Sequence, residues 1–130
     1  MNNAAMVQGL YEAAARGEHG VLMGALHPSI EWREAEGTRY AGGNPYVGPD
    51  AVGPLLGRIA TDVADFRLEP QTFTDGGDVV LVQGRYKGVG ANTKKPLDAA
   101  FAHIWYLREG KVVQFQQYTD TKQWGDVLEG

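Results

Sequence analysis

Residues 101–118 read FAHIWYLREGKVVQFQQY. Large apolar side chains alternate with other residues in both halves of this stretch, at the two-residue period of a β-strand. Between the halves, Arg108-Glu109-Gly110-Lys111 is a turn signal, and its glycine suits a left-handed backbone conformation. The pattern therefore predicts an antiparallel hairpin with strands over residues 97–107 and 112–118.

The register of this hairpin decides which side chains share a face. A type I turn over residues 108–110, with a bulge at the glycine, pairs Leu107 with Lys111. One face then carries Phe101, His103, Trp105, Val113, Phe115 and Gln117. The other face carries Ala102, Ile104, Tyr106, Val112, Gln114, Gln116 and Tyr118. A two-residue loop would instead set Gln116 and Gln114 beside His103 and Trp105, so both registers stay open.

The first face is aromatic, with two polar groups set into it. We expect Phe101, Trp105 and Phe115 to form the walls of a small-molecule pocket. His103 and Gln117 would then be the polar groups that meet a ligand. The second face mixes small, apolar and amide side chains, which is typical of a moderately polar dimer interface.

The rest of the chain predicts helices first and an antiparallel meander afterwards. Helices are expected over residues 7–14, 21–26 and 52–63, the last capped by Asp50, with a short terminal helix capped by Asp120. Further strands are expected over residues 30–34, 66–74 and 79–87, with Pro70 favouring an edge or a bulge. Residues 35–49 are rich in glycine and proline and predict a long loop. This order predicts an α+β fold, in which helices and a curved sheet form a cone with an open mouth.

Composition excludes several classes of function. The chain has 130 residues, 43% hydrophobic and 22% charged, which fits one globular domain. A net charge of −4 argues against nucleic-acid binding, and the absence of cysteine excludes disulfides and thiolate chemistry. The three histidines lack metal-ligand spacing, so no metal is expected. No apolar stretch approaches the ~20 residues of a membrane helix and no secretory signal is visible, so we expect a cytoplasmic protein without membrane contact.

Several segments carry a family resemblance. They are YEAAARGE at residues 11–18, IEWRE at 30–34, YVGPDAV at 46–52, FAHIW at 101–105 and GKVVQF at 110–115. With these, the chain resembles the SnoaL-like polyketide cyclase family, related to ketosteroid isomerase, in the nuclear transport factor 2-like (NTF2-like) superfamily. The resemblance spans about residues 3–128. It implies a single SnoaL-like domain over residues 1–130, an α+β cone, no cofactor, and a homodimer through the outer sheet face.

The resemblance also shows where this chain departs from the family. The cyclase acid/base aspartate position holds Gln117, which cannot transfer a proton at physiological pH. The isomerase base position falls on Trp32, its tyrosine donor on Leu10, and its acid on His103. The epoxide-hydrolase relatives need an Asp–Arg–Asp cluster, for which the chain offers only Arg85, Asp98 and Glu34.

Each candidate site residue has a functional and a structural interpretation. His103 is a proton donor or acid/base, or a buried histidine bonded to a carbonyl. Glu34 is a base near the pocket mouth, or a solvated charge at a strand end. Gln117 orients a ligand or caps a backbone group, and Trp32 lines the pocket or belongs to the core. Tyr40, with Tyr46 in the same loop, closes over a ligand or packs the loop against the body.

These residues support one main functional hypothesis. The protein would bind an apolar carbonyl- or hydroxyl-bearing metabolite and catalyse proton transfer on it, and the family resemblance implies isomerisation, dehydration or cyclisation as the reaction. The alternative is a non-catalytic ligand-binding or dimerisation domain on the same scaffold. A third hypothesis is a protein whose pocket is vestigial and whose outer sheet face recruits partners.

Overall fold

The computed structural model describes residues 2–130. Its helices are α1 (Asn3–Ala15), α2 (His19–Ala25), a short 3₁₀ helix (Ala41–Gly43), α3 (Pro49–Asp62) and α4 (Thr121–Glu129). Its strands are β1 (Leu26–Arg33), β2 (Tyr46–Val47), β3 (Val63–Asp75), β4 (Val79–Gly90), β5 (Pro96–Arg108) and β6 (Lys111–Thr119). The expected helices and strands are all present, most of them longer than expected. Within the described residues, no helix combines the length and the apolar character needed to cross a bilayer.

The six strands form one sheet in the order β2-β1-β6-β5-β4-β3. All neighbours are antiparallel except β1 and β6, which run parallel. The predicted α+β class is confirmed. The edge strand β3 has a register shift between Pro70 and Thr72, so the proline lies both on an edge and at a bulge.

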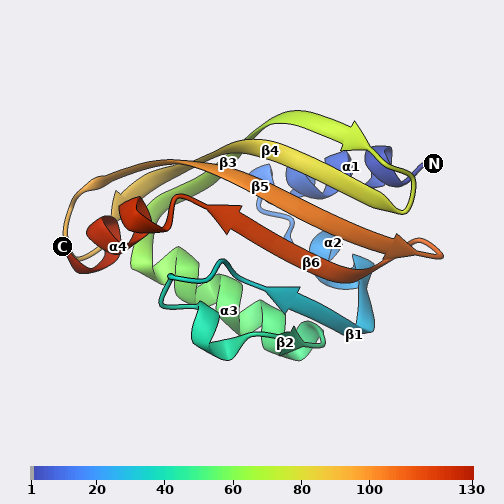
Figure 1. Cartoon of the computed structure of the whole chain (residues 1–130), viewed down its shortest axis with the longest axis horizontal. Helices are drawn as coiled ribbons and strands as arrows, with labels where there is room; N and C mark the ends of the chain where they lie inside the picture. The colour runs from blue at the N-terminus through green and yellow to red at the C-terminus, as the bar shows by residue number, and fades with distance from the viewer. Residues whose placement is uncertain (1) are drawn as a thin grey trace.

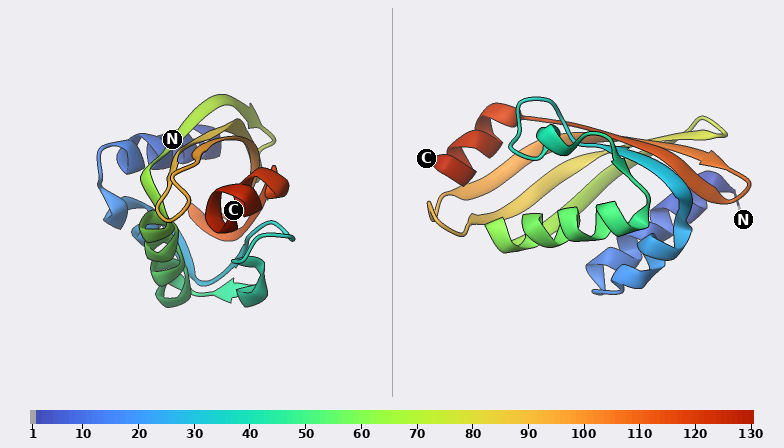
Figure 2. Two further views of the ribbon diagram at one scale, coloured as in Figure 1. Left: turned by 90° about the vertical axis from the view of Figure 1, so that its left-hand side faces the viewer. Right: turned by 90° about the horizontal axis from the view of Figure 1, so that it is seen from below.

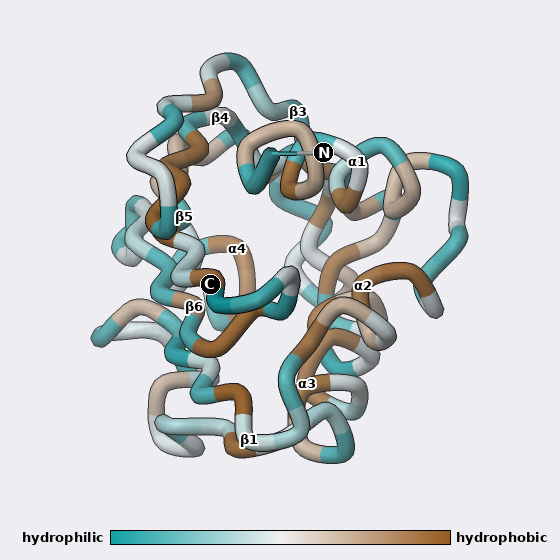
Figure 3. The backbone as a smooth tube through the Cα atoms, turned by 90° about the vertical axis from the view of Figure 1, so that its right-hand side faces the viewer, coloured by the Kyte–Doolittle hydropathy of each residue, from teal (hydrophilic) through white to brown (hydrophobic). Residues whose placement is uncertain are grey.

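The sheet curves around the hydrophobic core, and the helices close the remaining sides (Figure 1). Helix α1 packs on β3 and β4, α3 packs on β1 and β3, and α4 packs on β4 and β5. Seen from the end where α4 lies, the strands bend around a core bordered by α1, α3 and α4 (Figure 2). Hydrophobic and hydrophilic residues follow each other along β4 and β5 (Figure 3), because only one face of the sheet meets the core.

Local chemistry explains where the two later helices begin. Asp120 caps α4 as predicted, because its Oδ1 accepts a hydrogen bond of 3.1 Å from the backbone N–H of Gln123. The expected cap of α3 by Asp50 is wrong. The N-cap is Gly48 at φ 83°, and Pro49, with its fixed φ, starts the helix two residues before the start that a cap at Asp50 would give. Asp50 lies in the first turn, where a negative charge is favourable beside the helix N-terminus.

The turn between β5 and β6 corrects the favoured hairpin register. Arg108 pairs with Lys111, which leaves a two-residue loop of Glu109 at φ 51° and Gly110 at φ 78°. Two residues with positive φ match the twist of a hairpin, so this loop forms instead of a type I turn. The pairing of Leu107 with Lys111 is therefore wrong, and the two-residue alternative describes the turn.

A bulge beside the turn nevertheless restores the predicted aromatic face. Leu107 pairs with Val112 and Tyr106 with Gln114, so Val113 is an extra residue without a partner. Val112 is buried where Val113 was expected to be. Beyond the bulge, Trp105 faces Phe115, His103 faces Gln117 and Phe101 faces Thr119. The five other predicted side chains share the buried face: Phe101, His103, Trp105, Phe115 and Gln117.

Candidate functional site

His103 lies at the centre of a buried hydrogen-bond network. Its Nδ1 is 2.6 Å from the hydroxyl of Tyr11 on α1, and its Nε2 is 2.5 Å from the hydroxyl of Tyr86 on β4. The imidazole stacks on the ring of Phe101 with centroids 4.0 Å apart. His103 is thus buried and hydrogen-bonded on both ring nitrogens, and its partners are two tyrosines, whereas the structural interpretation had named a carbonyl.

The side chains of Trp105 and Gln117 form the two ends of this network. The indole N–H of Trp105 donates to the Tyr11 hydroxyl at 2.9 Å. The amide Nε2 of Gln117 donates to the Tyr86 hydroxyl at 2.7 Å, and its Oε1 accepts the backbone N–H of Ala35 at 2.9 Å. Gln117 therefore caps a backbone group and holds Tyr86 at the same time. We call the chain Trp105–Tyr11–His103–Tyr86–Gln117 the His103 network.

Burial keeps the His103 network uncharged. Desolvation lowers the pKa of His103 to about 3, and it raises the pKa of Tyr11 and of Tyr86 well above the ordinary value. The charge of Glu34 adds to the rise for Tyr86. At neutral pH the imidazole and both phenols are neutral, so these groups can offer hydrogen bonds but no charge.

Glu34 is a buried carboxyl group directly after β1. Its residue is only 3% exposed, so the interpretation as a solvated strand-end charge is wrong. Burial raises its pKa to about 7, against the smaller lowering effects of the Trp32 hydrogen bond and the Arg58 charge. The Trp32 indole N–H donates to Oε2 at 2.9 Å, whereas no group of residues 2–130 donates to Oε1.

Asn44 fixes the backbone of Glu34 from the loop that follows. The Glu34 N–H donates to Asn44 Oδ1 at 2.9 Å, and Asn44 Nδ2 donates to the Glu34 carbonyl at 2.8 Å. One amide side chain thus pairs with both backbone groups of Glu34, as a neighbouring strand would. The arrangement sets the direction in which the carboxyl group points.

The aromatic side chains expected as pocket walls pack against one another. Trp32 stacks on Phe115 at 3.8 Å between centroids, and Trp105 meets Phe115 at 4.7 Å. Trp124 of α4 adds a further ring at the α4 end of the core, 5.3 Å from Tyr86 and 6.3 Å from Tyr40. This end of the core is closed by the indole of Trp124.

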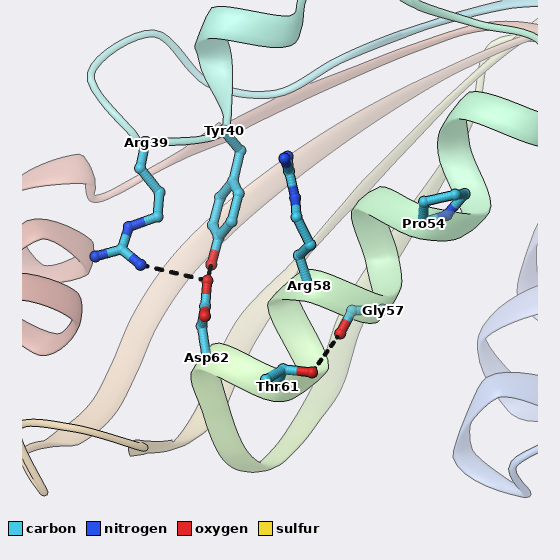
Figure 4. A pocket seen from close by; sticks show the side chains of 7 residues that line it. All are labelled: Arg39, Tyr40, Pro54, Gly57, Arg58, Thr61 and Asp62. Atoms are coloured by element: carbon cyan, nitrogen blue, oxygen red, sulfur yellow. Dashed lines mark hydrogen bonds and ion pairs between the residues drawn. The ribbon is translucent and has the colours of Figure 1, made fainter.

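Tyr40 packs the long loop against the body. Its hydroxyl donates to Asp62 Oδ2 at 2.6 Å, and its carbonyl accepts the hydroxyl of Tyr46 at 2.6 Å. Tyr40 also borders an open groove of about 520 Å³ beside α3 (Figure 4). The groove is lined by Arg39, Tyr40, Pro54, Gly57, Arg58, Thr61 and Asp62. It does not include His103 or Glu34, and neither does a second groove on the outer sheet face.

The three residues considered for an Asp–Arg–Asp cluster, Arg85, Asp98 and Glu34, do not contact one another as a group. Arg85 and Asp98 form an exposed ion pair, with Nε and Oδ1 2.6 Å apart. Glu34 is buried and makes no contact with that pair among the hydrogen bonds and ion pairs of residues 2–130. The structure therefore gives no support to an epoxide-hydrolase site built from these residues.

Four contributors to this region were absent from the sequence-based candidates: Tyr11, Tyr86, Asn44 and Trp124. Tyr86 has a sequence signal, because the alternation of β4 places it on the buried face two residues after Gly84. The resemblance set a tyrosine donor at Leu10. In the structure the next residue, Tyr11, carries the hydroxyl that meets His103, and Leu10 belongs to the hydrophobic core.

The fold and the enclosed polar groups define an NTF2-like α+β protein. The model of the SnoaL-like domain family matches residues 7–115, and the chain belongs to this family. An NTF2-like protein from Burkholderia thailandensis E264 is 27% identical, with a TM-score of 0.93, and the match covers 100% of this chain and 99% of that one. An NTF2-like protein of unknown function from Burkholderia pseudomallei K96243 is 26% identical, with a TM-score of 0.90 and the same coverage.

A third solved structure is that of TerC co-crystallised with polyporic acid. It is 24% identical with a TM-score of 0.86, and the match covers 98% of each chain. At this identity the likeness concerns the fold. A comparison with curated proteins finds no match.

Proposed function

We propose that the protein binds a small apolar carbonyl- or hydroxyl-bearing molecule between Glu34 and the His103 network, and transfers a proton on it without a cofactor. The observation that carries this proposal is the position of Gln117. Its Oε1 accepts the N–H of Ala35, the residue after Glu34, and its Nε2 donates to Tyr86. The side-chain amide of Gln117 thus links the segment of Glu34, the candidate base, to the hydroxyl of Tyr86, which belongs to the neutral His103 network.

The carboxyl group and the donors have complementary roles in this reaction. The Glu34 carboxylate removes a proton from the carbon beside a carbonyl group, and its free Oε1 receives that proton. The electron pair moves onto the carbonyl oxygen, where a hydrogen bond from a neutral hydroxyl of the network stabilises the enolate. Glu34 then returns the proton to a different carbon, which gives an isomer, or a β-hydroxyl group leaves with it as water. A pKa of about 7 suits a group that must both take and give a proton at neutral pH.

Access to this region requires movement of α4. The indole of Trp124 lies against Tyr86 and Tyr40, the two tyrosines whose pKa the charge of Glu34 helps to raise. Trp124 therefore covers the side on which base and donors meet. Beside the cap, α4 is held by Gln123 on the backbone of Asp98 and by Thr93 on its last turn. The burial of Trp124, Val127 and Leu128 also opposes its displacement.

The test combines ligand binding with proton exchange. A panel of hydrophobic ketones, enones, epoxides and aromatic polyketide mimics, with polyporic acid included, is screened by thermal shift on the wild type, His103→Gln and Glu34→Gln. A ligand at a hundred times its Kd stabilises the fold by about 2.7 kcal/mol. We expect a ketone that binds the wild type and binds His103→Gln more weakly.

A deuterium-exchange experiment tests whether Glu34 is the base. In D2O, the wild type should replace the protons beside the carbonyl of the bound ketone with deuterium, as followed by proton NMR. Glu34→Gln should bind the ketone and exchange at least a hundredfold more slowly, because general-base catalysis contributes about 10²–10⁴-fold. Equal exchange rates in the wild type and in Glu34→Gln would show that Glu34 is not the base.

The non-catalytic alternative has its own supporting observation. Gln117 stands at the cyclase aspartate position, and both ends of its amide are engaged, one by Ala35 and one by Tyr86. A ligand-binding protein would bind members of the panel and exchange none of their protons.

We also propose that two copies pair through the outer face of β5 and β6. Tyr118 is 57% exposed there, and Ile104, Tyr106, Gln114 and Gln116 are half-buried on the same face. Such a mixed apolar and amide surface fits the composition of dimer interfaces.

A further inference from the structure

The three central groups of the His103 network, Tyr11, His103 and Tyr86, carry one hydrogen more than the contacts between them can hold. Four contacts join its five side chains, and each contact carries one hydrogen. The two end contacts have fixed donors. The indole N–H of Trp105 can only donate to Tyr11. The Oε1 of Gln117 is identified by the Ala35 N–H that it accepts, so the group facing Tyr86 is the amide NH₂.

Three hydrogens therefore remain for the two central contacts. They are the hydroxyl hydrogens of Tyr11 and Tyr86 and the single N–H of a neutral His103. If Nδ1 of His103 carries the hydrogen, Tyr11 accepts twice and its own hydrogen is left over. If Nε2 carries it, the hydroxyl hydrogen of Tyr86 is left over instead. In either tautomer, one phenol hydrogen has no acceptor among residues 2–130.

Ionisation does not remove the surplus. Losing the hydrogen would leave a buried tyrosinate, and burial raises the pKa of both tyrosines far above neutral pH. Protonating His103 would add a fourth hydrogen, and burial lowers the pKa of the imidazole to about 3. The network is thus neutral and has an unused donor over the whole physiological pH range.

The surroundings of the two phenols decide which one has the unused hydrogen. Both phenols are enclosed by rings: Tyr11 by Phe73, Phe101 and Trp105, and Tyr86 by Phe66, Phe101 and Trp124. Of the two, Tyr86 is the one linked to the Glu34 segment, because Gln117 donates to its hydroxyl and accepts the N–H of Ala35, and the charge of Glu34 acts on it. A hydroxyl hydrogen on the Tyr86 side is attracted by the Glu34 carboxylate, so Nε2–H donates to Tyr86 and Nδ1 accepts from Tyr11.

From this count we infer that the Tyr86 hydroxyl is the group that donates to the ligand, and that the ligand brings an oxygen without a hydrogen of its own, as in a ketone or a quinone. This inference rests on the proposed function and narrows its substrate class to the carbonyl compounds. An alcohol is the poorer ligand, because its own hydroxyl hydrogen must reach the free Oε1 of Glu34 at the same time, so two hydrogen bonds have to be satisfied in one position. A hydrocarbon of the same shape leaves the surplus donor unpaired.

The ligand arm of the test compares acetophenone with ethylbenzene and phenylethanol, which share one ring and nearly one shape. We expect the wild type to bind acetophenone about 3- to 10-fold more tightly than ethylbenzene, the ratio that one net hydrogen bond supplies. Phenylethanol should lie between them. The preference should disappear in Tyr86→Phe and persist in Tyr118→Phe, the matched control, which removes an exposed hydroxyl outside the network. Equal affinities in the wild type, or a preference that survives in Tyr86→Phe, would overturn the inference.

A second arm needs no ligand and no variant. Nitrogen NMR of the imidazole distinguishes a protonated from a bare ring nitrogen. We expect Nε2 of His103 to be protonated and Nδ1 bare in the free wild type above about pH 7, where Glu34 is ionised. An imidazolium or the opposite tautomer would overturn the assignment to Tyr86. If none of the three probes binds, the proposed function fails, while the nitrogen spectrum still decides the count of hydrogens.

Discussion

Two buried residues, His103 and Glu34, have pKa values shifted in opposite directions. Burial lowers the pKa of His103 from 6.5 to about 3 and raises that of Glu34 from 4.5 to about 7. Between about pH 3 and 6.5, His103 is protonated in the unfolded chain but not in the folded protein. This residue therefore makes the free energy of unfolding rise with pH. Between about pH 4.5 and 7 the folded protein keeps a proton on Glu34 that the unfolded chain loses, so this residue makes stability fall with pH.

The two effects oppose each other between about pH 5 and 6.5, and single variants should separate them. Relative to the wild type, Glu34→Gln should gain up to about 1.4 kcal/mol of unfolding free energy for each pH unit of increase. His103→Gln should lose a similar amount per unit over the same range. Urea unfolding at several pH values measures both slopes. Two variant curves that run parallel to the wild type would contradict the burial of these groups.

The sequence predicted which side chains share the buried face but not what they contact. Alternation alone placed His103, Trp105 and Gln117 together, because the pleat of a strand fixes the side on which each residue lies. The partners Tyr11 and Tyr86 come from a helix and from a neighbouring strand. Their contact with His103 depends on how these elements pack, which no local pattern encodes. The burial of Glu34 was missed for the same reason.

At the scale of elements, the β5–β6 turn offers a prediction about stability. Glu109 has φ 51°, a left-handed conformation that costs free energy for residues other than glycine, asparagine and aspartate. Glu109→Asn should stabilise the protein by about 0.5–1 kcal/mol, because Asn-Gly suits this two-residue turn best. Gly110→Ala should destabilise it by about 1–2 kcal/mol. Urea unfolding measures both, and a loss of stability in Glu109→Asn would contradict the observed turn.

Helix α4 gives a second prediction at this scale. Asp120→Ala removes the side chain that caps the helix, at a cost of about 1 kcal/mol. Hydrogen exchange of the α4 amides should then be roughly fivefold faster, since 1 kcal/mol corresponds to about that factor in the opening equilibrium. The amides of β5 should change less, because α4 can open without the sheet.

Lys122→Ala is the matched control for this experiment. The Lys122 side chain is exposed and, among residues 2–130, pairs only with Asp126 in the same helix, and solvent screens this ion pair. Equal acceleration in Lys122→Ala and Asp120→Ala would mean that the cap does not hold α4 in place.

Element types were predictable here, whereas some of their pairings were not. Hydrophobic periodicity predicted the strands of the meander and the helix that became α3. The turn sequence fits two loop lengths, and the bulge at Val113 has no local signal that would choose between them. The parallel pairing of β1 with β6 joins strands that are far apart in the chain, so the sequence of neither strand alone predicts it.

For the whole molecule, the proposed dimer predicts a concentration-dependent mass. Sedimentation at micromolar concentration should give a dimer for the wild type and a monomer for Ile104→Arg, which puts a charge into the centre of the outer face. The variant should keep the thermal response to acetophenone, because Ile104 points away from the core. A wild-type monomer under these conditions would contradict the dimer.

The matched control for the dimer places the same charge elsewhere. Gln8→Arg changes an exposed position of α1, on the other side of the sheet. It should sediment as the wild type does. A monomer in both variants would show that added charge, and not the outer face, disrupts association.

The pairing of β1 with β6 also determines how long β1 must wait for its partner while the protein is being synthesised. Leu26 and Val112 are partners, yet they are 86 positions apart (26 against 112). A ribosome adding about 5–20 residues per second needs roughly 4–17 s to cover that distance. Until then the only other partner of β1 is the two-residue strand β2, so most of its hydrogen-bonding edge is open to other chains. Every nascent copy therefore presents an unpaired strand edge until residues 111–119 have left the ribosome.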